Sequence, residues 1–145
     1  MKITIGDRSS DRGLFKGIKP DVPSPELLTF MFECALGLRQ LISPQLAARI
    51  ELIRVTFFQP YMCRECQPTF YIIWHSVGGE KKEEIFDEAP YARPDNCNLK
   101  TFDREAYVQS LVDEFLKRVR REARTAMTDG AALRRMATKK IVKAA

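Results

Sequence analysis

The sequence predicts a single α+β domain that carries a basic helical tail. Apolar residues recur at helical spacing after Ser24 and again after Asp103, whereas β-branched and aromatic residues between these segments recur with a period of two. The 145 residues suit one hydrophobic core, and contents of 45% hydrophobic and 30% charged residues are ordinary for a globular protein. We therefore expect one folded domain over residues 24–127, between an arm and a tail.

The N-terminal arm comprises residues 1–23. Glycines and prolines interrupt it at Gly6, Gly13, Gly17, Pro20 and Pro23, and only residues 2–5 alternate as a short strand would. We expect an extended segment here.

Two helices are predicted to follow the arm. Ser24 offers an N-cap oxygen and Pro25 suits the first helical position. Apolar residues between Leu27 and Ile42 surround most of this helix, which predicts that it is central and buried. The pair Ser43-Pro44 repeats the capping signal and opens a short second helix that reaches about Ile50.

The middle of the chain predicts a three-stranded antiparallel meander. Its strands are expected near residues 51–58, 70–77 and 80–86. The second strand is apolar on both faces, as a central strand is, while the lysines and glutamates of the third suit an exposed edge. Gly78-Gly79 is a hairpin signal between these two strands.

A long amphipathic helix should begin after Thr101 or Asp103. Its apolar residues recur three and four positions apart, at Val108, Leu111, Val112, Phe115, Val119 and Ala123. The helix is predicted to end near Met127, because Thr128, Asp129 and Gly130 are poor helix formers. Residues 128–145 would then form a separate basic tail of helical composition.

Positive charge is concentrated at the C-terminal end. From residue 117 onward ten basic residues face two acidic ones, a net charge of +8, so that residues 1–116 carry −3 of the total of +5. Arginine and lysine on one helix can bind phosphates without reading base sequence. The candidate nucleic-acid-binding residues are Lys117, Arg118, Arg120, Arg121, Arg124, Arg134, Arg135, Lys139, Lys140 and Lys143.

Two other interpretations of this charge remain open. The basic end could bind an acidic protein surface. The chain could also be an interaction or structural subunit of a larger assembly, such as a viral, phage or ribonucleoprotein particle, in which partners order the arm and the tail.

The most specific local motif is Cys63-Arg64-Glu65-Cys66, which lies between two expected strands. A CxxC at a hairpin tip can present two thiolates to one zinc ion, as a zinc knuckle does, and Cys97 is the best third ligand. The interpretation that we prefer is that the chain binds no cofactor and that these thiols are free.

Neither catalysis nor membrane association is expected. His75 is the only histidine, and no phosphate-binding glycine loop is present. No apolar run reaches the roughly 18–20 residues of a membrane span, and the first residues do not resemble a signal peptide. The sequence thus predicts a non-enzymatic intracellular, cytoplasmic protein.

Overall fold

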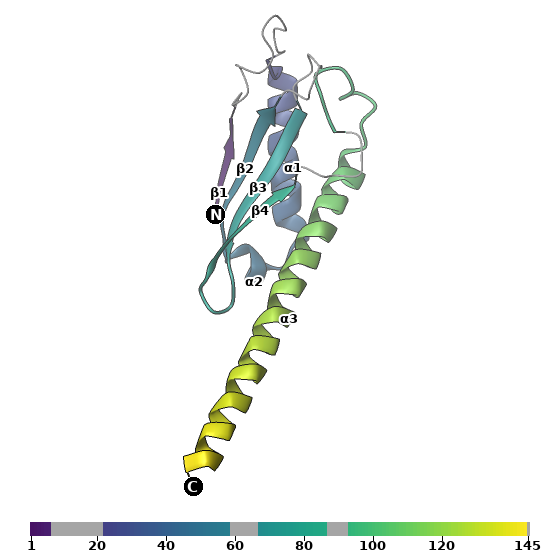
Figure 1. Cartoon of the computed structure of the whole chain (residues 1–145). Coiled ribbons are helices and arrows are strands. Elements are labelled where there is room, and N and C mark those ends of the chain that lie inside the picture. Colours follow the sequence, from purple (N-terminus) through teal and green to yellow (C-terminus); the bar gives the residue numbers. More distant parts are fainter. Residues whose placement is uncertain (7–21, 59–66, 87–92, 145) are drawn as a thin grey trace, which may run out of the picture.

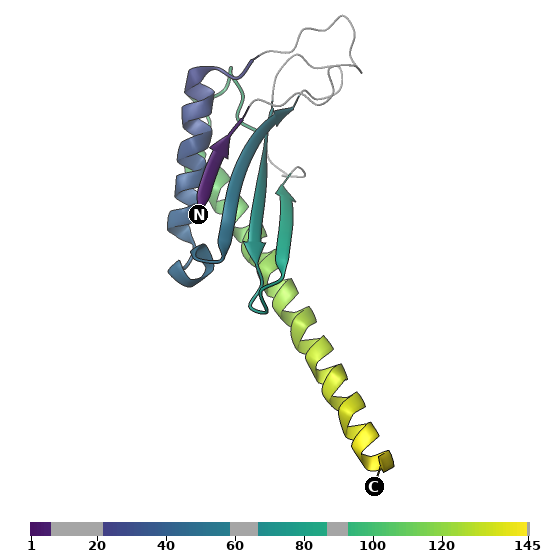
Figure 2. The same cartoon turned by 90° about the vertical axis from the view of Figure 1, so that its left-hand side faces the viewer.

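The computed structural model describes residues 1–6, 22–58, 67–86 and 93–144, with side chains of the last range described through Gly130. Within them the chain is a mixed α+β protein, in which helices cover one face of a sheet (Figures 1 and 2). The elements in order are β1 (Lys2–Ile5), α1 (Pro25–Leu41), α2 (Pro44–Ala47), β2 (Ile50–Phe58), β3 (Gln67–His75), β4 (Lys81–Phe86) and α3 (Arg104–Ala144).

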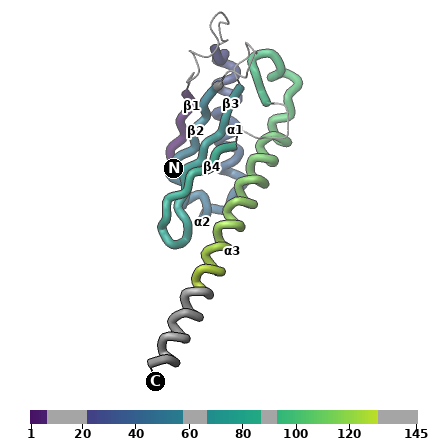
Figure 3. Tube along the Cα trace, in the orientation of Figure 1, coloured from purple at the N-terminus to yellow at the C-terminus, as the bar shows by residue number. Residues whose placement is uncertain are grey.

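The sheet has four strands in the order β1-β2-β3-β4, so the prediction of a three-stranded antiparallel meander was wrong. Strands β2, β3 and β4 are antiparallel neighbours, but β1 pairs parallel to β2, with Ile3 opposite Ile53. Figure 3 shows β1 beside β2 at one edge. Two parallel strands need a crossover connection of a dozen or more residues, which here passes through α1. No turn signal next to β1 therefore indicates which strand it pairs with.

Side-chain caps begin the helices where the sequence predicts. Ser24 Oγ accepts a hydrogen bond from Leu27 N at 3.1 Å, and Ser43 Oγ accepts one from Leu46 N at 3.2 Å. Asp103 Oδ1 accepts from Ala106 N at 3.1 Å at the start of α3. Each cap satisfies a backbone donor that the first helical turn leaves unpaired.

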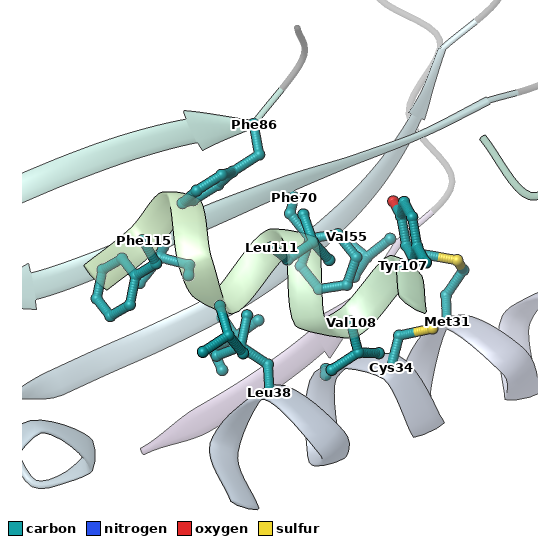
Figure 4. Packing of buried hydrophobic residues seen from close by; sticks show 14 of the residues in the cluster. Met31, Cys34, Leu38, Val55, Phe70, Phe86, Tyr107, Val108, Leu111 and Phe115 are labelled. Carbon is teal, nitrogen blue, oxygen red and sulfur yellow. The ribbon is translucent and has the colours of Figure 1, made fainter. Parts of the chain in front are cut away.

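The core lies between the sheet and the two long helices (Figure 4). Phe115 of α3 is fully buried, and its ring contacts those of Trp74 and Phe86 edge-on, with centroids 5.9 and 6.3 Å apart. Helix α1 contributes one buried face, made by Leu27, Met31, Cys34, Ala35 and Leu38. The prediction that α1 is buried around most of its circumference was wrong, because the sheet and α3 both pack on that one side.

Helix α3 does not end near Met127 but continues to Ala144 as one helix of 41 residues, about 61 Å long. Its side chains pack on the body as far as Val119, whereas residues 123–129 are exposed and the helix projects past the sheet (Figures 1 and 2). Gly130 costs a helix about 1 kcal/mol relative to alanine, which weakens this stretch without ending it.

Candidate nucleic-acid interface

Four cations lie on the side of α3 that points away from the sheet. Lys117, Arg120, Arg121 and Arg124 are exposed, and at about 100° per residue they fall within one arc of roughly 100° opposite Phe115. We call these four residues the basic side of α3. Among the described residues none of them has an ion-pair partner, so their charges are available to an anion.

Arg118 is placed differently from the other predicted binding residues. Its Nη1 donates a hydrogen bond to the carbonyl oxygen of Ile85 at 2.8 Å and lies 3.4 Å from Glu84 Oε2. Its Nε donates to Glu114 Oε1 at 3.2 Å, and the guanidinium lies 4.2 Å from the centroid of the Phe86 ring. With its side chain only 22% exposed, Arg118 fastens α3 to β4.

A second contact fastens α3 to β4 one turn later. Lys82 Nζ lies 3.1 Å from Glu122 Oε1 and 3.2 Å from Glu80 Oε1. The hydrogen bond to Glu122, followed by the one to Glu80, raises the pKa of Lys82 above its ordinary value. Together, Arg118 and Lys82 fix the rotation of α3 about its axis, and that rotation turns the basic side outward.

The remaining predicted residues lie in the last five turns of α3, where the backbone is helical. At about 100° per residue, two of them continue the arc of the basic side, whereas three fall outside it. Arg135 and Lys139 belong to the first group, and Arg134, Lys140 and Lys143 to the second.

Of the three cysteines of the predicted zinc knuckle, Cys97 lies in the described part of the chain. Cys63 and Cys66 lie outside the described residues, so the zinc site stays a prediction. Cys97 is exposed, but the neighbouring Asp95 carboxylate already accepts hydrogen bonds from the backbone amides of Cys97 and Asn98 at 2.7 and 2.9 Å. No cluster of three or more potential metal ligands occurs among the described residues.

Cys34 is a core residue and not a reactive thiol. It is fully buried between α1 and α3, and burial raises the pKa of its thiol to about 12. Because the thiolate is the nucleophile and the metal ligand, this side chain is inert at neutral pH.

His75 forms a surface pair with Glu51. His75 Nε2 lies 2.9 Å from Glu51 Oε2, with the two side chains 40% and 50% exposed. The hydrogen bond from His75 is the main reason that the pKa of Glu51 lies below its ordinary value. Both side chains of the pair are accessible to solvent.

Comparison with known proteins gives no functional assignment: no family model, curated protein or solved structure matches this chain. Among the described residues, no helix is both apolar and long enough to cross a bilayer. The charges and contacts of α3 are therefore the basis for a functional proposal.

Proposed function

We propose that this chain is a small non-enzymatic nucleic-acid-binding protein that grips phosphates with the basic side of α3. One observation carries the proposal: Lys117, Arg120, Arg121 and Arg124 are exposed, share one side of a rigid helix and have no carboxylate partner among the described residues. Charges held at fixed spacing on a helix need little reorganisation to meet a row of phosphates.

The length of the helix supports a polymer as the ligand. From Lys117 to Lys143 the backbone is helical over a rise of about 39 Å, which matches roughly 11 base pairs of duplex at 3.4 Å each. The contacts would be to phosphates alone, which predicts binding that tolerates sequence and weakens steeply with salt.

The deciding experiment measures binding of the full chain to a labelled duplex of about 20 base pairs and to a single-stranded RNA over a series of salt concentrations. The test variant is Arg120→Glu/Arg121→Glu/Arg124→Glu. The matched control is Lys2→Glu/Arg39→Glu/Lys100→Glu, which makes the same change in net charge at exposed positions elsewhere.

If the proposal holds, only the α3 variant loses binding, and its log–log salt slope falls in magnitude by about 3, one for each phosphate contact removed. Equal losses in both variants would mean that net charge alone drives binding. No binding by the wild-type chain at low salt would overturn the proposal.

A partner protein is the second candidate, and the projecting part of α3 favours it. Residues 123–129 are exposed and do not belong to the hydrophobic core, although a helix of this length gains most of its stability from packing. In this case the chain is a subunit of a larger assembly, and the basic side faces an acidic protein surface. Retention of α3-dependent binding to an acidic protein, with none to either nucleic acid, would favour it.

A further inference from the structure

A groove runs between α1 and α3 on the side of the helices that faces away from the sheet. It has a volume of about 580 Å³, and its apolar part is made by Leu36, Gly37, Leu41 and Val108. The helices approach closely here, because a Cβ added to Gly37 would lie 3.4 Å from Val108 Cγ1. Leu41 is 53% exposed at the end of the groove, so apolar surface remains open to solvent.

The rim of this groove is acidic. Glu33 and Glu105 line it, and Glu26 lines an adjoining hollow that shares Glu33. Arg104 forms an ion pair with Glu33, which leaves Glu26 and Glu105 with no ion-pair partner among the described residues. An occupant that complements the groove therefore has an apolar side flanked by positive charges.

The projecting half of α3, residues 123–144, has this character. The side of α3 that lines the groove at Glu105 and Val108 continues, at about 100° per residue, through Ala123, Ala126 and Gly130. Small residues allow two helices to approach closely. The sequence extends the same spacing to Leu133, Ala137 and Ile141, and residues 123–144 carry a net charge of +5.

The chain cannot place this segment in its own groove. Helix α3 is continuous, and its N-terminal turns line the groove. Its C-terminal end therefore lies about one helix length away from the groove (Figures 1 and 2). Only a second molecule can bring a projecting half to that position.

We infer that two copies of this chain associate by pairing their α3 helices antiparallel, so that the projecting half of each lies in the α1–α3 groove of the other. The two halves match in length: residues 104–122 span about 28 Å and residues 123–144 about 33 Å. Such a pairing has two-fold symmetry and uses one surface patch on both subunits. At about 100° per residue, position 140 flanks the apolar side of the projecting half. The pairing therefore brings Lys140 toward Glu105, and it leaves both basic sides facing outward.

Light scattering of the full chain, without nucleic acid, tests the pairing. The measurement uses about 100 µM protein, a concentration that lies between dissociation constants of about 1 µM and about 1 mM. The expected mass is twice the 16.7 kDa of one chain. A monomer at this concentration, or a larger assembly in which the variants below have no effect, would overturn the inference.

Charge exchange identifies the contacting surfaces. Glu105→Lys in the groove and Lys140→Glu in the tail should each weaken the dimer by about tenfold or more, and combining the two changes should restore it. The control Glu83→Lys makes the same change in charge at an exposed residue of β4 and should leave the mass unchanged. If the two changes together weaken the dimer further, the segment does not lie in the groove.

Steric variants test the apolar side separately. Ala123→Gln/Ala126→Gln adds bulk to the side of α3 that faces the partner and should shift the chain to a monomer. Thr125→Gln/Thr128→Gln adds bulk on another side of the same turns and should not. Circular dichroism must show equal helix content, and equal masses for the two variants would count against this side as the interface. Nucleic-acid binding by Ala123→Gln/Ala126→Gln is a separate result, because this variant leaves the basic side unchanged.

Discussion

The two halves of α3 have similar helical backbones but different surroundings. Residues 104–122 are fastened to the body by Phe115, Arg118 and Glu122, whereas residues 123–129 are exposed and project from it. The first half has a net charge of +1 and the second +5. The packed half thus supplies stability and orientation, and the projecting half carries most of the net charge of the helix.

The largest expected difference between the halves comes from truncating a buried side chain. Phe115→Ala removes a fully buried ring that contacts Trp74 and Phe86, and it should lower the free energy of unfolding by about 3–5 kcal/mol. Thr125→Ala in the projecting half should change it by no more than about 0.5 kcal/mol. Urea denaturation of both variants measures this difference. Equal losses in the free energy of unfolding would contradict the prediction.

Arg118 tests whether a basic residue of the packed half belongs to the body or to the binding surface. Arg118→Ala removes a partly buried guanidinium that donates to Ile85 O and lies on the Phe86 ring, so it should cost about 1–3 kcal/mol of stability. Arg121→Ala should cost no more than about 0.5 kcal/mol. Thermal unfolding gives the stabilities.

The same two variants should differ in the opposite sense in their affinity for nucleic acid. Arg121→Ala removes an exposed cation of the basic side and should weaken binding, while a folded Arg118→Ala chain should bind much as the wild type does. A loss of affinity in Arg118→Ala equal to that in Arg121→Ala, with stability unchanged, would place Arg118 in the interface instead.

Local signals predicted the helix starts and the antiparallel strands, because a cap, a hairpin turn or a period of two depends on neighbouring residues. Ser24, Ser43 and Asp103 cap helices as expected. The place of β1 could not be predicted, since its pairing with β2 spans about fifty residues. The groove between α1 and α3 depends on residues that are even farther apart in the sequence, such as Gly37 and Val108, so no sequence pattern indicated it.

For the candidate site, the sequence identified the charges but not their orientation. Helical spacing places Arg118 about 100° from Lys117. Only the structure shows that the Arg118 guanidinium contacts Glu84 and the ring of Phe86 on β4. The end of α3 was misjudged because Thr128, Asp129 and Gly130 have weak helix propensity, and propensity is a weak guide when the flanking residues favour the helix.

Gly130→Ala tests the stability of the projecting half alone. Alanine is favoured over glycine in a helix interior by about 1 kcal/mol, so amide exchange in residues 123–144 should slow by about fivefold. Global unfolding should change little, because this half contributes no described core residue. Hydrogen exchange followed by mass spectrometry distinguishes the halves, and faster exchange would mean that Gly130 is needed for close packing.

The smallest expected effect concerns Glu122, the last residue that joins α3 to β4. Glu122→Gln removes the main cause of the raised pKa of Lys82. A raised lysine pKa contributes stability that is fully present below the ordinary value of 10.5 and is lost as the pH rises through the higher folded value. Thermal unfolding on both sides of pH 10.5 should therefore show a smaller alkaline loss in Glu122→Gln than in the wild type. Glu105→Gln, which removes a carboxylate from the other end of α3, should keep the wild-type alkaline loss, and equal losses in all three proteins would show that Lys82 does not fasten the helix.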